Sequence, residues 1–136
     1  MEDYFYTKTH KYFFIDKNIL VSEILPNIDF TLEELEKNNE YRRNLIGENQ
    51  VCFLVDIRNI KSINYETREA ARKEAESGIY IAIALLVENS VSKLIAGIAL
   101  GFNKPNVPIK IFDNQEQAVS WLNEYSISDE KTQKYA

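Results

Sequence analysis

Two uninterrupted apolar runs, residues 51–55 and 79–87, constrain the fold of this chain more than any other feature. Runs that lack a polar residue at every second position are typical of strands covered on both faces. The segment between the runs is rich in alanine and charged residues, with a helical pattern. A strand, a helix and a second strand in this order predict a βαβ unit, in which a right-handed crossover joins parallel strands.

Local chemistry predicts the limits of the helix in this unit. The side chain of Asn64 can accept a backbone N–H bond at the helix start, and Gly78 can end the helix in the left-handed conformation. Glu69 and Lys73 are four residues apart, in the order that favours a surface ion pair.

The N-terminal part of the chain predicts an antiparallel hairpin. Residues 4–15 are dense in aromatic side chains, which favour a strand. Asp16, Lys17 and Asn18 suit a tight turn, because aspartate and asparagine tolerate unusual backbone angles. A second strand is expected over residues 19–25.

Two further helices are predicted from capping-box spacing, in which side chains satisfy free N–H groups at a helix start. Thr31 and Glu34 begin a helix that we expect to end at Gly47, with a thin apolar stripe and much of its surface wet. Asp113 and Glu116 begin the last helix, which follows a short strand and is expected to run to about residue 125. Its apolar face carries Ala118, Trp121, Leu122 and Tyr125.

Residues 91–102 predict a helix with an unusual composition. The segment has no charge after Lys93, and Gly97 and Gly101 are four residues apart. One interpretation is a helix packed closely on the sheet, with glycines where two backbones approach. The other is a surface offered to an apolar ligand, a membrane or a second subunit, since an apolar helix surface has to be covered.

These elements predict one α/β domain over residues 1–126, followed by a polar tail over residues 127–136. The mixed sheet should have about five strands, namely the antiparallel hairpin and a parallel βαβαβ part, with about four helices. The length of 136 residues fits a single domain.

Composition argues against several classes of protein. A net charge of −5 argues against nucleic-acid binding, which needs a clustered basic surface. Cys52 is the single cysteine and is expected to be a core residue, so no internal disulfide is predicted. The sequence shows neither a signal peptide nor an apolar run of about 20 residues that could span a bilayer. A cytoplasmic protein is therefore expected.

The sequence offers little for catalysis. His10 is the single histidine and is expected to face solvent or lie at a sheet edge. One histidine and one cysteine provide no zinc-site spacing, and no known nucleophile or phosphate-binding motif is present. We therefore expect a protein that is not an enzyme and has no metal or cofactor.

The candidate binding residues gather after the first apolar run. Asp56 stands at the carboxyl end of a central strand, where ligands bind in open α/β sheets, although its ordinary role would be to tie the following turn. Arg58 could pair with Asp56 or with an anionic ligand. The remaining candidates lie at the start of the next helix and along the apolar helix: Ser62, Asn64, Tyr65, Leu94, Ile98 and Phe102.

The stretch from Leu54 to Ala71, LVDIRNIKSINYETREAA, resembles the STAS superfamily of anti-sigma-factor antagonists. Those domains have an apolar strand ending in aspartate, then a turn and a helix opened by Asp-Ser-Ser-Gly. The closing segment KIFDNQEQAVSWL resembles the uncharacterised SpoIIAA-like branch. Aligned on Asp56, the family's serine falls on Tyr65 and its glycine on Thr67, so the chain departs from the pattern of a phosphorylated switch.

This resemblance implies a SpoIIAA-like fold and two functional expectations. The first is a non-enzymatic module that binds a protein partner or a second copy of itself. The alternative is a carrier of an apolar small molecule or lipid, which could act at a membrane surface. This alternative arises because the SpoIIAA-like branch also resembles lipid-transfer domains. The sequence leaves both open, with an enzyme that uses Asp56 or His10 as the third and least favoured alternative.

Overall fold

The structure, a computed structural model, describes the backbone of residues 3–101 and 106–135 and the side chains of residues 3–97 and 106–126. The strands are β1 (Phe5–Tyr6), β2 (His10–Ile15), β3 (Ile19–Ile24), β4 (Val51–Asp56), β5 (Tyr80–Leu86) and β6 (Ile109–Phe112). The helices are α1 (Leu32–Ile46), α2 (Tyr65–Ala75), α3 (Ser90–Gly101) and α4 (Gln115–Tyr135).

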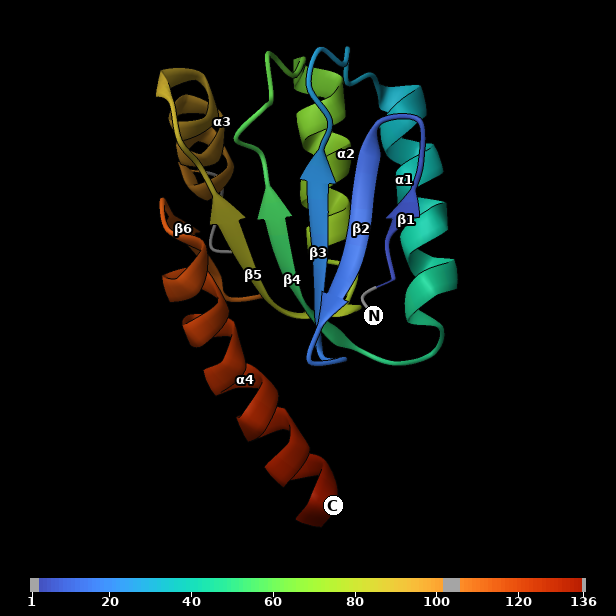
Figure 1. Ribbon diagram of the computed structural model, residues 1–136, viewed down its shortest axis with the longest axis vertical. Coiled ribbons are helices and arrows are strands. Elements are labelled where there is room, and N and C mark those ends of the chain that lie inside the picture. Colours follow the sequence, from blue (N-terminus) through green and yellow to red (C-terminus); the bar gives the residue numbers. More distant parts are fainter. Residues whose placement is uncertain (1–2, 102–105, 136) are drawn as a thin grey trace.

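The strands form one mixed sheet in the order β1-β2-β3-β4-β5-β6. The pairs β1–β2 and β2–β3 are antiparallel, whereas β3, β4, β5 and β6 are parallel neighbours. Helices α1, α2 and α3 each join adjacent parallel strands, so right-handed crossovers place them on one face. Helix α4 covers the opposite face (Figure 1). The predicted α/β architecture with a mixed sheet is confirmed.

The sheet has six strands because the predicted strand over residues 4–15 is divided. Thr7 turns the chain: its amide donates to the carbonyl of His10 over 2.9 Å. Its hydroxyl accepts from the amides of His10 and Thr9, at 3.0 and 3.3 Å. A threonine side chain that bonds nearby backbone groups competes with the ladder of a strand. β1 therefore folds back on β2 as a short edge strand.

The predicted hairpin turn is confirmed. Asp16 and Lys17 have φ angles of 52° and 66°, in the left-handed region that tight hairpin turns use, and together with Asn18 they form a three-residue loop. This turn sets the pairing of β2 with β3, in which Ile15 lies opposite Ile19.

Two of the predicted helix starts are confirmed. The side chain of Thr31 accepts from the amide of Glu34 over 3.3 Å, and Asn64 accepts from the amide of Thr67 over 2.8 Å. Helix α1 ends at Gly47, whose φ is 70°. Each cap satisfies an N–H group that a helix start leaves free.

Three local predictions were wrong. Asn114, not Asp113, begins α4, because its side-chain oxygen accepts from the amide of Gln117 over 3.0 Å. Helix α2 ends at residue 75, and Gly78, with a φ of 95°, lies in the turn before β5. Glu69 pairs with Arg72 at 3.1 Å rather than with the residue four positions on, since the guanidinium reaches it at the three-residue spacing.

The last helix is longer than predicted, because α4 runs to residue 135 rather than to about residue 125. The predicted tail over residues 127–136 therefore begins as a continuation of this helix. Side chains beyond residue 126 lie outside the part of the chain that the structure describes.

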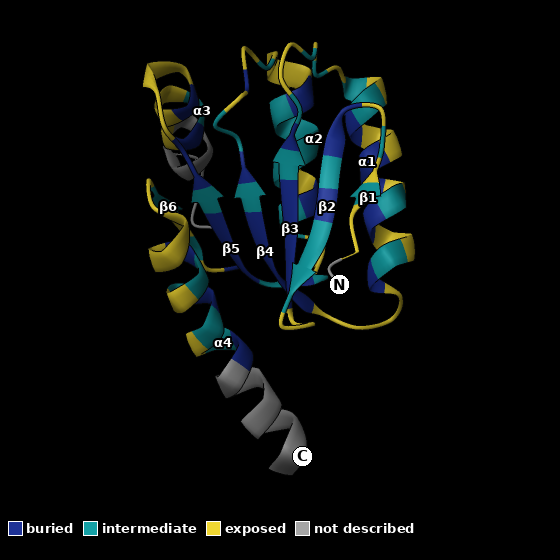
Figure 2. Cartoon of the chain, in the orientation of Figure 1, coloured by how far each residue is buried: buried dark blue, intermediate teal, exposed yellow. Residues whose placement is uncertain are grey.

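The core has two layers, one on each face of the sheet, and many residues of the central strands are buried (Figure 2). Under α4 the sheet presents small residues such as Ala82 and Ala84, and Ala118 of the helix is also fully buried there, so the helix can approach closely. Cys52 belongs to this layer, as predicted. The layer under α1 and α2 has larger side chains: Tyr12, Leu20, Ile46, Val51, Phe53, Tyr80, Ile83 and Val107.

Candidate functional site

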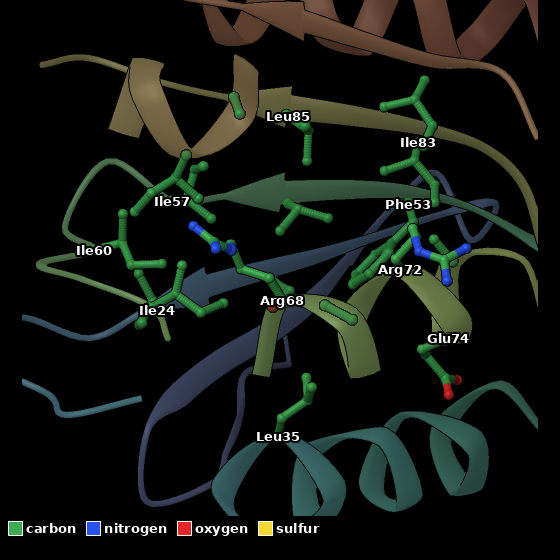
Figure 3. Close-up of a pocket in the computed structure, with 18 of the residues that line it drawn as sticks. Ile24, Leu35, Phe53, Ile57, Ile60, Arg68, Arg72, Glu74, Ile83 and Leu85 are labelled. Atoms are coloured by element: carbon green, nitrogen blue, oxygen red, sulfur yellow. The ribbon is translucent and has the colours of Figure 1, made fainter. Parts of the chain in front are cut away.

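A cavity of about 180 Å³ lies between α2 and the face of the sheet that α2 covers. Its floor consists of apolar side chains from the two central parallel strands, Phe53 and Val55 of β4 and Ile83 and Leu85 of β5. Figure 3 shows Phe53, Ile83 and Leu85 on the side of the sheet that faces the helix. The cavity thus lies over the centre of the sheet.

The composition of α2 explains why this space is not filled. The helix presents Arg68, Ala71, Arg72 and Ala75 to the cavity, and these positions recur at the three- and four-residue spacing of one helix face. A helix that packs on an apolar sheet usually carries large apolar residues there. Alanine is too short to reach the floor, so a gap remains beneath the helix.

Loops close one end of the cavity. The segment after β4 contributes Ile57, Ile60 and Ile63, and the last residue of β3 contributes Ile24. Phe30, just before α1, also contributes. This apolar end lies at the carboxyl edge of the parallel strands, where open α/β sheets bind their ligands.

Arg42 lines the cavity from α1 and is 5% exposed. Its guanidinium donates to the hydroxyls of Tyr80 and Tyr12, each over 3.0 Å, and to the side chain of Asn39. The guanidinium carbon lies 5.2 Å from the ring centre of Phe53. Burial alone would lower the pKa of Arg42, but its interactions with Tyr12 and Tyr80 raise it above the ordinary value. Arg42 therefore remains charged in the core.

His10 also lines the cavity and is buried, so the prediction of a solvent-facing or edge histidine was wrong. Its ring lies 5.0 Å from the ring centre of Phe30, and its Nδ1 lies 2.7 Å from the hydroxyl of Thr9. The rings of Tyr12 and Phe30 pack against the imidazole, which accounts for its burial. Burial, together with the charge of Arg42, lowers the pKa of His10 from 6.5 to about 3, so the ring is neutral near pH 7.

The structure places Asp56 and Arg58 together in the turn after β4. Asp56 is buried, and its carboxylate accepts from the amide of Arg58 over 3.1 Å and from its guanidinium at 3.0 and 2.8 Å. Hydrogen bonding to Asp56 raises the pKa of Arg58. The aspartate is thus occupied within its own turn, the ordinary role considered from the sequence.

Among the described candidates, Ser62, Asn64, Tyr65 and Leu94 do not line the cavity. Ser62 and Asn64 are exposed, and Asn64 caps α2. Tyr65 is 64% exposed and Leu94 is 66% exposed. The remaining two candidates, Ile98 and Phe102, lie outside the described side chains.

In the part of helix α3 whose side chains the structure describes, residues 90–97, some positions are buried and others exposed. Ser92 and Ala96 are fully buried, whereas Val91 and Leu94 are exposed. A side chain added at Gly97 would meet no atom within 4 Å, so the expectation that this glycine marks a close backbone approach was wrong. The helix starts at Asn89, whose side chain accepts from the amide of Ser92 over 2.9 Å.

Sequence reasoning missed the residues that make the cavity distinctive: His10, Arg42, Arg68, Ala71 and Arg72. The sequence does contain a signal. Residues 68, 71, 72 and 75 have the spacing of a buried helix face, but their arginines and alanines are typical of a solvent-exposed face. Arg42 likewise lies in the stripe of α1 that faces the sheet.

The described residues show neither a metal-binding group nor a membrane span. No three histidine, cysteine or carboxylate side chains come together there in a way that could hold a metal ion. Within the same part of the chain, none of the helices combines the length and the apolar character needed to cross a bilayer.

Residues 13–126 match the family model described as Domain of unknown function (DUF7793). The chain belongs to this family. The match begins within β2, ends within α4 and includes the whole cavity floor. No curated protein matches this DUF7793 chain.

The fold of the DUF7793 domain is SpoIIAA-like. It is similar to the crystal structure of an uncharacterised protein of the DUF3478 family from Shewanella loihica PV-4, which is described as having a SpoIIAA-like fold. The TM-score is 0.57, with 12% identity over 90% of this chain and 92% of the other. At this identity the similarity establishes the fold alone, and it confirms the fold that the sequence resemblance implied.

Proposed function

We propose that this domain is a non-enzymatic binding module for a small apolar molecule, which occupies the cavity between α2 and the sheet. The observation that carries the proposal is the cavity of about 180 Å³ with a floor of Phe53, Val55, Ile83 and Leu85. Apolar cavities of about 150 Å³ stay dry and can take up a molecule such as benzene. This cavity is therefore large enough for a ring or a short hydrocarbon chain.

Energetics favour a ligand in this position. An apolar wall that no atom contacts lacks the hydrophobic and van der Waals free energy that packing would supply. A ligand that restores the missing contacts would recover part of that free energy. The location also favours a ligand. The caps of α2 and its contacts with α1 hold the helix in place. The short side chains on its inner face leave space above the sheet.

The test fills the cavity from within the protein. Ala71→Phe places a ring in the cavity from α2, whereas Ala70→Phe adds the same ring at a neighbouring position that does not line it. We expect freshly purified wild-type protein and Ala70→Phe to carry a mass excess in native mass spectrometry, or to gain thermal stability with benzene or indole. Ligand at 100 times its dissociation constant stabilises a protein by about 2.7 kcal/mol.

Ala71→Phe should abolish both signals and should not lower the melting temperature, because filling a cavity commonly stabilises a core. The proposal is wrong if Ala71→Phe binds as well as wild type. It is equally wrong if the wild-type protein carries nothing and is not stabilised by any of these molecules.

A protein-interaction role is the second candidate, and one surface favours it. Tyr65 at the start of α2 and Val91 and Leu94 on α3 are exposed by 64%, 43% and 66%. Both helix starts lie at the same edge of the sheet (Figure 1). Asn89, before α3, donates to the carbonyl of Arg58 over 3.3 Å and so ties this edge together.

Leu94→Glu and Tyr65→Glu test this second role, since both positions are exposed and the fold should tolerate the change. If the surface binds a protein, each variant should lose a partner in pull-downs from the source cell or should change the oligomeric state in solution. Variants that keep their fold, every partner and the oligomeric state would exclude this surface. Loss of ligand binding in the cavity would not be expected from either change.

A further inference from the structure

The cavity that we propose as a binding site has an electrostatic character that differs from that of the whole chain. The protein carries a net charge of −5, yet the cavity wall includes three arginines, Arg42, Arg68 and Arg72, and two glutamates, Glu74 and Glu76. His10 adds no charge near pH 7, because its pKa is about 3. Charged side chains of both signs, with one more cation than anion, thus lie next to an apolar floor.

Some of these charges are neutralised by partners. Arg72 lies 3.1 Å from the carboxylate of Glu69 and 3.3 Å from that of Glu76. The carboxylate of Glu74 lies 2.6 Å from the guanidinium of Arg43, which is outside the wall. Among the described residues, no carboxylate pairs with the other two arginines of the cavity, Arg42 and Arg68.

Arg42 has no carboxylate partner among the described residues, but its hydrogen bonds are largely satisfied. Each of its three nitrogens donates to a neutral group, on Tyr80, Tyr12 or Asn39. Its charge is therefore held in place without being neutralised. Arg42 makes the interior favourable for an anion, but it is poorly placed to form new hydrogen bonds.

Arg68 is in the opposite situation. Its Nε is buried and has no hydrogen-bond partner, and in the part of the chain that the structure describes Arg68 forms no ion pair. The guanidinium carbon of Arg68 lies 5.9 Å from the ring centre of Tyr65. Figure 3 shows the side chain extending from α2 toward Ile57, with Ile24 and Ile60 beside it. Arg68 as a whole is half-buried, but a buried N–H without an acceptor is costly unless a ligand supplies one.

We propose that the cavity selects an apolar molecule with a single carboxylate, and that the guanidinium of Arg68 binds this carboxylate. This inference rests on the proposed function, because it concerns the same cavity. A guanidinium pairs with a carboxylate through two parallel N–H···O bonds, which would use the free Nε of Arg68. The apolar part of the molecule then lies over Phe53 and Leu85 on the floor.

The volume limits the size of this ligand. A cavity of about 180 Å³ is slightly larger than the ~150 Å³ that holds benzene. A single aromatic ring with a carboxylate, or a medium-length fatty acid, fits this range, whereas a whole phospholipid does not. Benzoate and octanoate are therefore suitable probes, and octan-1-ol is the neutral counterpart of octanoate.

The experiment compares octanoate with octan-1-ol by isothermal titration calorimetry at pH 7 on wild type, Arg68→Met and Lys73→Met. Methionine keeps an unbranched apolar side chain at position 68 and removes the charge. Lys73→Met removes the same charge from an exposed position of α2 that does not line the cavity. Arg68→Met should weaken octanoate binding by roughly 10- to 100-fold, the factor for hydrogen bonds to a charged group, and should leave octan-1-ol binding unchanged. Lys73→Met should change neither.

A second measurement needs no variant. In the NMR spectrum of wild-type protein, the Nε–H resonance of Arg68 should shift on addition of octanoate and should not shift on addition of octan-1-ol. This signal reports on the N–H that the structure leaves free.

The outcomes separate the two proposals. If octan-1-ol binds but octanoate does not, or if Arg68→Met weakens both equally, the carboxylate inference is wrong while the binding of apolar molecules stands. If octanoate binds equally well to wild type and Arg68→Met and the Arg68 resonance does not move, the inference is also overturned. If no probe, benzoate included, binds to wild type, both the inference and the proposed function are wrong.

Discussion

The Nε of Arg42 donates a hydrogen bond to the hydroxyl oxygen of Tyr80 over 3.0 Å, which joins α1 to β5 inside the core. A second bond of the same length, from Nη1 to the hydroxyl of Tyr12, joins the helix to β2. One buried guanidinium thus connects the antiparallel part of the sheet with the parallel part. The same side chain borders the cavity.

Arg42→Ala should destabilise the fold by about 2–4 kcal/mol. The change leaves the buried hydroxyl of Tyr80 without its donor, which costs about 1–3 kcal/mol, and it removes packing against Phe53. Urea unfolding followed by circular dichroism measures the effect. Lys37→Ala on the same helix is the control, because Lys37 is 63% exposed and should change stability by less than about 0.5 kcal/mol. Equal midpoints for the two variants would contradict this role of Arg42.

The buried histidine should make stability depend on pH. The pKa of His10 is about 3 in the folded protein and 6.5 in the unfolded chain, so the unfolded state binds the extra proton between these values. The free energy of unfolding should therefore be unaffected by His10 above pH 6.5 and should fall by up to about 1.4 kcal/mol per pH unit below it. Urea unfolding of wild type and His10→Gln at pH 7, 6 and 5 isolates this contribution, since other groups titrate in both. Parallel pH profiles would show that His10 is not buried as a neutral ring.

Leu54→Asp should prevent folding. Leu54 is fully buried in the layer under α4, and an aspartate there would be an unpaired charge in the core. Leu94→Asp is the matched control on a residue that is 66% exposed. Far-UV circular dichroism should show an unfolded chain for the first variant and native helix content for the second. A folded Leu54→Asp protein would contradict the described core.

Trp121→Ala should cost about 2 kcal/mol, less than the ~3–5 kcal/mol of a fully buried tryptophan. Trp121 is only partly buried and packs against Phe112 and Tyr125, at ring-centre distances of 5.6 and 4.9 Å. Leu122→Ala provides the comparison, because Leu122 is fully buried under the same helix and its truncation should cost about 2–5 kcal/mol. Urea midpoints of both variants test the docking of α4, and an unchanged midpoint for Leu122→Ala would refute it.

The strands, the βαβ unit and most of the caps could be predicted because they depend on nearby residues. The turn at Asp16 and Lys17 and the cap at Asn64 use bonds that span only a few positions. The errors were of the same local kind, such as Asn114 in place of Asp113, where two neighbouring residues both suited a cap. The division of the first strand at Thr7 depended on a single side chain bonding to nearby backbone.

By itself, the sequence determined the order of strands and helices, the parallel direction of the central strands and the faces that are apolar. Only the tertiary structure decided that His10 and Arg42 are buried, because that depends on the rings that pack against His10 and on tyrosines from two distant strands that bind Arg42. It also decided that a cavity exists. A gap forms where the short side chains Ala71 and Ala75 stand above the sheet, and its size depends on how far the caps and α1 hold α2 from the strands.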